Sequence, residues 1–322
     1  MHNPTPPAQK QIREECVHFN NGKGLLLRGI LHHADPELHK NITLICLNTG
    51  LNDMVGWHRL QVKMARFFAG LGFAVLRYDD EGIGDSEGEI LDTSIVKIFS
   101  DIETGMFVNN ADCAVAFTRT LFPRNKIVYL GFCGGGLTAI HSASVNQHVD
   151  GVINIGGPVT LASKDYLNKT DPWEVQRKMN RYRNKIMDKN VWRKLITLDI
   201  DFENFFRSFW HFGVHKLKGS YRESEFVEDI DDMKNLNKLV FFNFEKFVKR
   251  KCPCLFFYAE HDSATWELKK YFLARYQDKY FTETTLNDFV EIQQANHIFS
   301  SDDSQKALKD GVLAWLGKHF IP

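Results

Sequence analysis

Short apolar runs alternate with longer segments of helical periodicity along most of the chain. Strands buried on both faces read as continuous apolar runs, whereas helices on a surface keep one polar side. The alternation therefore predicts an α/β fold, with a mostly parallel sheet flanked by helices. The predicted strands are residues 25–31, 42–47, 73–78, 126–132, 151–156, 254–259 and 289–294, and the predicted helices are residues 58–71, 111–122, 136–145 and 304–320.

One interval, residues 160–251, breaks this rhythm. It is rich in aromatic and charged residues, and its stretch PWEVQRKMNRYRNKIMDKNVWRKL has strong helical periodicity, but it contains no clear strand of the series. An interval of this length is too long for an ordinary connection between strands. We therefore predict an inserted, mainly helical lid at residues 160–251 and a core domain formed by residues 1–159 and 252–322.

The charge and composition of the chain give no support to some classes of binding partner. The 322 residues include 40 Lys plus Arg and 40 Asp plus Glu, so the net formal charge is zero. No global field favours nucleic acid or an anionic membrane. The N-terminal MHNPTPPAQKQIREE lacks the apolar core of a signal peptide, and no apolar run approaches the ~20 residues that cross a bilayer. A cytoplasmic protein with no membrane span is the resulting expectation.

The stretch GFCGGG places Cys133 between a predicted strand and a predicted helix. A residue on such a sharp turn projects its side chain above the sheet, where the free N–H groups of the helix also point. The turn is tight, so Gly131, Gly134 and Gly135 fit where larger side chains would collide. Cys133 is therefore a candidate nucleophile, and an inert, packed thiol in a binding protein is the alternative.

Four motifs in order resemble those of the α/β-hydrolase superfamily, with cysteine in place of the usual serine. LICLNTGLND resembles the oxyanion loop, with Thr49 where histidine is common, and RYDDEGIGDSEG resembles the turn that follows a later strand. GFCGGG resembles the Gly-x-nucleophile-x-Gly elbow. FYAEHDSAT and QQANHIFSS resemble the two late strand ends that carry the acid and the histidine. The resemblance implies an α/β-hydrolase fold and covers most of the chain outside the predicted lid.

The same resemblance implies a catalytic triad of Cys133, His297 and Asp262. Cysteine attacks as thiolate, which a neighbouring imidazole or helix N-terminus favours. The carboxylate would fix the histidine tautomer and stabilise imidazolium. His261 is the nearest rival for the base and Glu260 for the acid, but His297 and Asp262 match the spacing of the family better.

The implied oxyanion hole consists of two backbone N–H groups, from Gly134 after the nucleophile and from Leu51 in the early loop. This chemistry requires no cofactor. A phosphate-binding loop does not fit, because the dinucleotide fingerprint needs glycine at position 133. Nor does a metal site fit the CPC at Cys252 and Cys254, because one intervening residue is tighter than zinc spacing and no second pair exists.

Two features of the predicted lid allow both a functional and a structural interpretation. The basic stretch 177–194 could dock an acyl carrier protein or the phosphates of a coenzyme A thioester, or it could be a solvated helix face. Its aromatic residues could line an acyl pocket or form the lid's own core. These aromatic residues include Phe202, Phe205, Phe206, Phe209, Trp210 and Phe212.

A cysteine nucleophile changes the expected reaction, because the acyl-enzyme is then a thioester that also reacts with amines, alcohols and thiols. The first hypothesis is an acyl-transferring hydrolase that acts on a small-molecule ester or thioester. The second is an acyltransferase or thioesterase-like cyclase of a biosynthetic pathway, and the third is a non-catalytic ligand-binding protein. The chain resembles dienelactone hydrolases, which use a cysteine nucleophile in this fold, at GFCGG, but those enzymes are compact and lack a lid of this size.

Overall fold

A single eight-stranded sheet organises the computed structural model, which describes residues 12–90, 94–162 and 235–321. The strand order is β1-β2-β4-β3-β5-β6-β7-β8; β1, β2 and β4 pair antiparallel, and all other neighbours are parallel. The strands are β1 (Glu14–Asn20), β2 (Leu26–His32), β3 (Ile42–Leu47), β4 (Ala74–Tyr78), β5 (Lys126–Phe132), β6 (Gly151–Ile155), β7 (Cys254–His261) and β8 (Asn287–Asn296).

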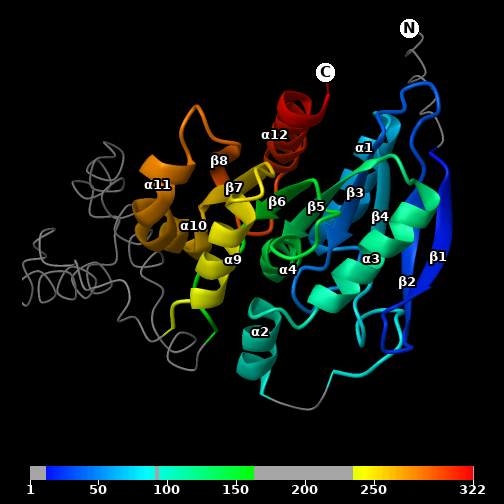
Figure 1. Ribbon diagram of the computed structural model, residues 1–322, viewed down its shortest axis with the longest axis horizontal. Coiled ribbons are helices and arrows are strands. Elements are labelled where there is room, and N and C mark those ends of the chain that lie inside the picture. Colours follow the sequence, from blue (N-terminus) through cyan, green and yellow to red (C-terminus); the bar gives the residue numbers. More distant parts are fainter. Residues whose placement is uncertain (1–11, 91–93, 163–234, 322) are drawn as a thin grey trace, which may run out of the picture. The chain divides into compact units, whose positions relative to one another are not determined.

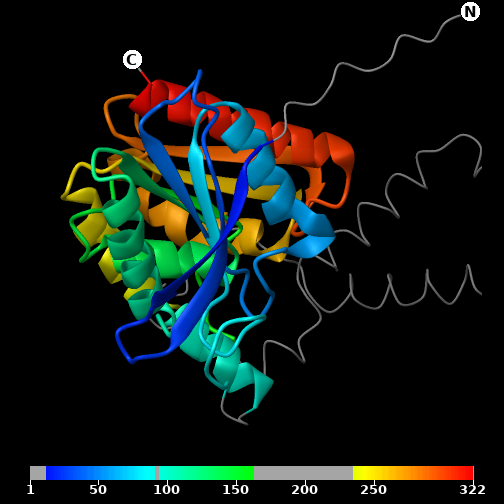
Figure 2. The same ribbon diagram turned by 90° about the vertical axis from the view of Figure 1, so that its right-hand side faces the viewer.

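Helices cover both faces of this sheet (Figure 1). In the turned view of Figure 2, α1 and α12 lie on one side of the strands, and α3 and α4 lie on the other. The helices are η1 (Trp57–Arg59), α1 (Leu60–Gly70), α2 (Ile95–Glu103), α3 (Val108–Leu121), α4 (Gly134–Ala143), α9 (Lys238–Val248), α10 (Ser263–Glu267), the π-helical η3 (Leu268–Leu273), α11 (Ala274–Tyr280) and α12 (Asp302–Phe320).

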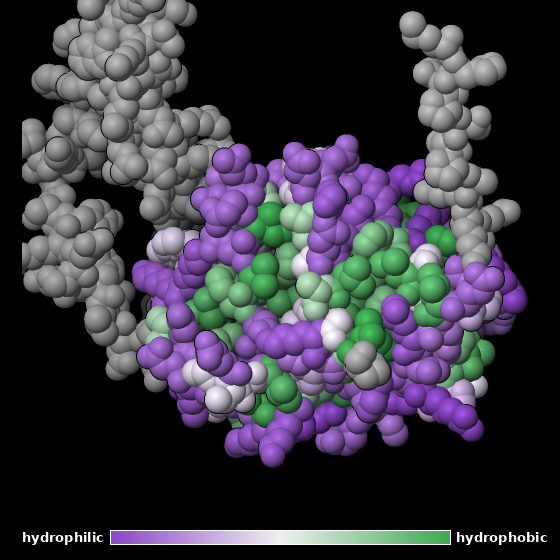
Figure 3. Space-filling view, turned by 90° about the horizontal axis from the view of Figure 1, so that it is seen from above, coloured by the Kyte–Doolittle hydropathy of each residue, from purple (hydrophilic) through white to green (hydrophobic). Residues whose placement is uncertain are grey.

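The central strands are the best buried part of the molecule, which explains why their sequences are continuously apolar. Every residue of β3, β4 and β6 is buried. One large cluster joins β3 and β5 to Phe68 of α1 and to Leu308 and Val312 of α12. The surface seen in Figure 3 shows apolar patches separated by polar residues. Among the described helices, none combines the length and apolar character that a membrane span requires.

All seven predicted strands and the four predicted helices are confirmed, with ends displaced by a few residues. The sequence analysis missed β1, whose first residues are charged and exposed at the edge of the sheet. It also missed α2, and it did not predict the helical segment that α10, η3 and α11 form between β7 and β8.

The structure describes the chain up to Ala162 and again from Asn235. The two points are tied together by an antiparallel bridge between Thr160 and Leu236. The Leu161 N–H donates to the Asn235 carbonyl at 2.7 Å, and the Asn237 N–H donates to the Val159 carbonyl at 2.9 Å.

The predicted lid lies largely outside the described residues. These exclude the basic stretch 177–194 and the lid aromatics from Phe202 to Phe212. Within the range predicted for the lid, α9 is described, and it packs against α4 of the core. The domain boundaries at 160 and 251 stay a prediction.

Candidate active site

Cys133 occupies a strained backbone position between β5 and α4. Its φ of 50° and ψ of −119° lie where residues other than glycine are rare. The neighbouring strand holds it there, because the Cys133 N–H donates to the carbonyl of Ile155 in β6 at 2.8 Å. Strained residues of this kind persist only where their surroundings fix them, and they cluster at functional sites. The half-buried thiol thus stands at the N-terminus of α4, as the elbow motif predicts.

The glycines around Cys133 allow α4 to begin against the sheet. A Cβ on Gly131 would overlap the carbonyl of Gly135. A Cβ on Gly135 would lie 2.5 Å from the carbonyl oxygen of Asn48 and 2.9 Å from that of Leu47. These neighbours are backbone atoms, which cannot rotate away as a side chain can. The close approach of strand and helix therefore requires glycine at both positions.

Substitution of Gly135 by alanine should destabilise the fold. The added methyl group must displace the end of β3, and we expect the free energy of unfolding to fall by about 1–3 kcal/mol. Urea denaturation followed by circular dichroism measures the change. The control is Gly317→Ala in α12, where an added Cβ meets nothing within 4 Å; there we expect a gain of up to about 1 kcal/mol. Equal losses in the two variants would contradict the packing argument.

His297 and Asp262 meet above the ends of β7 and β8. The His297 Nδ1–H donates to Asp262 Oδ2 at 2.7 Å. The other oxygen, Oδ1, accepts the Ala264 N–H at 3.1 Å and thereby caps α10. The Asp262 side chain is 5% exposed and that of His297 is 31% exposed. One carboxylate thus orients the imidazole and is itself oriented by a helix.

Asp262 and Cys133 are the two groups whose interactions act on the pKa of His297. Burial by itself lowers this pKa. The interactions with Asp262 and Cys133 outweigh burial and hold it well above its ordinary value of 6.5. Because Nδ1 bonds to Asp262, Nε2 is the nitrogen that remains for the thiol.

The two rival residues take part in other interactions. Glu260 Oε2 accepts the backbone N–H of Gln294 at 2.7 Å, beside an irregularity in the pairing of β7 with β8. Nε2 of His261 lies 3.7 Å from that same carboxylate oxygen, and its side chain is 47% exposed. Glu260 therefore supports the backbone of β8, and neither residue is the partner of His297 in the hydrogen bonds described above.

The early loop after β3 lies against the start of α4. The position of a Cβ on Gly134 is 3.6 Å from both N and Cα of Gly50. Gly50 N–H donates to the Asn48 carbonyl at 3.1 Å, whereas the Leu51 N–H has no acceptor within the described part of the chain. Gly134 is the first residue of α4, where an N–H lacks an intrahelical acceptor. These two N–H groups are the predicted oxyanion donors.

The turn after β4 fixes the same early loop. The Ser86 side chain bonds within this turn, where it donates to the Asp79 carbonyl at 2.6 Å. Asp80 instead accepts from Asn110 of α3 at 3.1 Å, and Arg77 donates to the Met54 carbonyl at 2.7 Å. The Met54 N–H donates to Asp79 Oδ1 at 2.6 Å. Side chains of this turn therefore fix residues outside it, namely Met54 in the early loop and Asn110 in α3.

The other cysteines differ more than the sequence indicates. Cys46, Cys252 and Cys254 are buried, as expected of small core residues, but Cys16 is exposed and Cys113 is half-buried. Burial raises the pKa of Cys46 and of Cys252 to about 12, so both thiols remain protonated at neutral pH. Cys16 is exposed because it lies on the edge strand β1.

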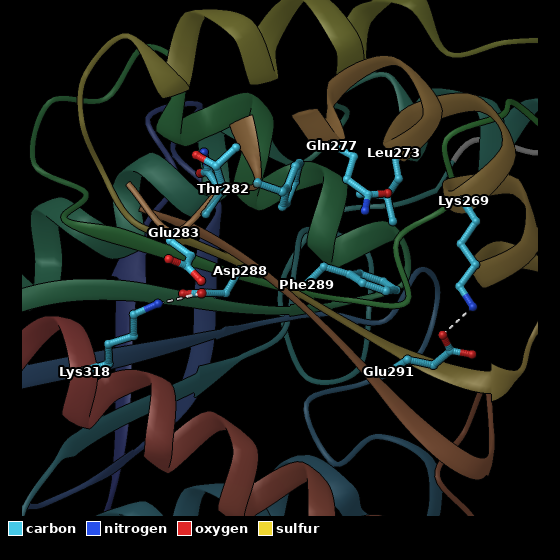
Figure 4. A pocket seen from close by; sticks show the side chains of 11 residues that line it. Lys269, Leu273, Gln277, Thr282, Glu283, Asp288, Phe289, Glu291 and Lys318 are labelled. Carbon is cyan, nitrogen blue, oxygen red and sulfur yellow. Dashed lines mark hydrogen bonds and ion pairs between the residues drawn. The ribbon is translucent and has the colours of Figure 1, made fainter. Parts of the chain in front are cut away.

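A pocket of about 790 Å³ lies elsewhere, beside the first half of β8 (Figure 4). Its wall includes Phe289 and two ion pairs, Lys269 with Glu291 and Lys318 with Asp288. It contains none of the predicted triad residues, because His297 follows the opposite end of β8. The paired charges leave little net field, so we assign no role to this pocket.

Comparisons with solved structures identify the fold. An esterase from Pyrococcus furiosus is 13% identical, covers 96% of this chain and 94% of its own, and has a TM-score of 0.56. Est1E from Butyrivibrio proteoclasticus, solved with ferulic acid, is 16% identical over 95% of this chain and 100% of its own, with a TM-score of 0.54. A dienelactone hydrolase from Anabaena variabilis is 13% identical over 96% and 99%, with a TM-score of 0.52. At these identities the similarity establishes the α/β-hydrolase fold.

Sequence comparison gives the family. No curated protein matches the chain. The model of a hydrolase family described as serine aminopeptidase, S33, matches residues 39–282. This range is more than half of the chain; it includes Cys133 and Asp262 and ends before His297. The chain is therefore a hydrolase that belongs to the serine aminopeptidase S33 family.

Proposed function

We propose that this hydrolase cleaves an ester or thioester through a covalent acyl-enzyme on Cys133, with His297 as base and Asp262 as its orienting acid. One observation carries the proposal: His297 hydrogen-bonds to Asp262 at 2.7 Å, and the Cys133 that acts on the same imidazole is held on a strained elbow. The family description names a serine enzyme, so cysteine is the chemical departure of this chain. The esterases among the similar structures support ester hydrolysis in general.

In the acylation step, Nε2 of His297 takes the thiol proton and the sulfur attacks the carbonyl carbon of the substrate. The resulting oxyanion accepts hydrogen bonds from the N–H groups of Gly134 and Leu51. Removal of one such donor typically costs about 10²–10³-fold in kcat. The imidazolium then protonates the departing alcohol or thiol, and a thioester to Cys133 remains.

In the second step, His297 deprotonates water, which attacks the thioester and releases the carboxylic acid. The thiol of Cys133 is regenerated when the imidazolium returns its proton. A bound amine or hydroxyl in place of water would give an amide or ester by the same sequence of proton transfers. Hydrolysis and acyl transfer thus share one intermediate and differ in the acceptor that reaches it.

Trapping that intermediate tests the proposal. The protein is mixed with p-nitrophenyl esters, acyl thioesters and, because of the family description, aminoacyl p-nitroanilides. Rapid quenching and intact mass followed by peptide mapping should locate an acyl group on the peptide of Cys133. The adduct should persist in Cys16→Ala, which removes an exposed thiol, and vanish in Cys133→Ala. Shortening of its lifetime by added amines would indicate transfer, and an alkylation-inert Cys133 without any adduct would favour a binding protein.

Apolar side chains surround the two proposed oxyanion donors. Phe99 of α2 lies against Gly50, with its Cε1 3.3 Å from the position of an added Cβ. The Cγ2 of Ile102 lies 2.8 Å from the corresponding position on Gly134. Leu51 packs on the cluster of Ile83, Ile102 and Phe107. A carbonyl held by these donors would bring its substituents next to apolar surface, which supports an apolar acyl group.

Substitution of Phe99 by alanine should therefore weaken activity most for long acyl chains. Phe99 is 36% exposed, so its ring is accessible. We expect kcat/KM for a p-nitrophenyl hexanoate to fall about tenfold, and that for the acetate to change little. Phe242→Ala on α9, where the side chain is 64% exposed, is the matched control. Equal losses for both esters would show that Phe99 does not contact the acyl chain.

A further inference from the structure

Trp57 packs against the imidazole of His297. The indole and imidazole centroids lie 5.4 Å apart, with an interplanar angle of 61°. Trp57 begins η1 and is half-buried. The sequence analysis gave it no role, because 240 residues separate the two rings in the chain and no motif includes Trp57.

The backbone that carries Trp57 is strained. Gly56 has a φ of 69°, and the next two residues after Trp57, His58 and Arg59, have φ values of 51° and 59°. Two successive non-glycine residues in the left-handed region are unusual, since their Cβ atoms crowd the backbone. Such conformations persist where the surrounding structure fixes them, and they are concentrated at functional sites.

Bonds from the end of β4 fix the start of this loop. Met54, three residues before Trp57, donates its N–H to Asp79 and accepts from Arg77, at 2.6 and 2.7 Å. Both partners are buried. Gly56 in turn packs on Gln61, whose Cγ lies 3.1 Å from the position of an added Cβ. The strained loop is thus anchored on both sides of Trp57.

This geometry points to a specific task for the indole. We propose that Trp57 is a positioning residue, whose ring holds the imidazole of His297 in the orientation that bonds Asp262 through Nδ1 and presents Nε2 to Cys133. The inference rests on the function proposed above. Rotation of the imidazole about its Cβ–Cγ bond would break the hydrogen bond to Asp262 and turn Nε2 away from its present direction, and a ring packed at 5.4 Å restricts that rotation.

The groups whose interactions act on His297 are Asp262 and Cys133, and both interactions favour its protonated form. Misorientation of the ring would weaken both interactions together. The reactivity of Cys133 should then change along with catalysis, since the imidazolium stabilises the thiolate that reacts. Alkylation of Cys133 reports this pairing without any assumption about the natural substrate.

The experiment compares Trp57→Leu with Trp57→Phe, which retains an aromatic ring. Iodoacetamide labelling of Cys133 is followed by peptide mapping from pH 5 to pH 10, and kcat and KM are measured with a p-nitrophenyl ester. In Trp57→Leu we expect the half-maximal labelling rate to shift to higher pH by about one unit and kcat to fall about 10- to 100-fold. Trp57→Phe should restore both to within about threefold.

Trp266→Leu removes a half-buried indole of α10 that packs on Tyr271 at 5.9 Å, and it is the matched control. It should leave the labelling profile unchanged. A labelling profile in Trp57→Leu that matches the wild type, with a change in KM alone, would overturn the proposal and leave Trp57 as a substrate contact. Failure of the proposed function would be different: the wild type would label at Cys133 but form no acyl-enzyme with any ester or thioester.

Discussion

Cys133→Ala is expected to lower kcat/KM by about four orders of magnitude or more, while the fold is retained. Loss of the nucleophile removes the covalent route, and the oxyanion donors alone give only modest acceleration. A small side chain at this position leaves the packing of α4 intact, because the thiol is half-buried and points above the sheet edge. Steady-state kinetics with the best ester, together with a urea denaturation midpoint, measures both parts of the prediction.

Cys133→Ser distinguishes a site adapted to thiolate from one that accepts any nucleophile. Here too we expect most activity to be lost, on the order of 10²–10⁴-fold, because a hydroxyl must be deprotonated as it attacks. Undiminished turnover in the serine variant would remove the case for a thiolate mechanism. The matched control Cys16→Ala should keep wild-type rates, since Cys16 lies on the exposed edge strand β1.

Asp262→Asn is expected to reduce kcat by on the order of 10⁴-fold. The amide oxygen can still cap α10 by accepting the Ala264 N–H, so the loop should keep its conformation. What is lost is the negative charge beside Nδ1 of His297, which helps to hold the pKa of that imidazole well above 6.5. The pKa should fall, which the titration of the His297 resonances by NMR measures directly.

The raised pKa of His297 also determines how the stability of the fold depends on pH. A histidine whose pKa is raised by folding contributes stability that is complete below about pH 6.5 and is lost as pH rises through the folded-state value. In Asp262→Asn this part of the pH dependence should diminish. Glu260→Gln is the control, because Glu260 accepts from the backbone of β8 and not from His297. A similar loss of activity in both variants would contradict the assignment of the acid.

Burial explains how much of the fold could be predicted from the sequence. Residues 42–47 and 126–132 were predicted with the observed ends, because strands inside a parallel sheet present unbroken apolar runs bounded by polar residues. β1 pairs on one side only and begins with Glu14 and Glu15, so its pattern is that of a solvated segment. An edge strand can therefore form its backbone hydrogen bonds without the continuous apolar run from which a strand is predicted.

Some features of the candidate site depend on local sequence, whereas others depend on contacts between residues that are distant in the chain. The elbow could be predicted because a tight turn restricts the sequence locally to glycines around Cys133. The pairing of His297 with Asp262 followed from the resemblance to a family, not from any local pattern. The contact between Trp57 and His297 could not be predicted, since it depends on how a clamped loop after β3 meets the end of β8. Only tertiary structure carries that information.

The bridge between Thr160 and Leu236 brings together two points that lie 76 residues apart in the sequence. Because these residues are paired, a turn of a few residues could join them. Cys133 lies before this junction, and Asp262 and His297 lie after it, at the ends of strands that belong to one sheet. The segment between could therefore be exchanged or shortened during evolution or by design without a change in the register of the strands. One catalytic core could in this way serve different substrates.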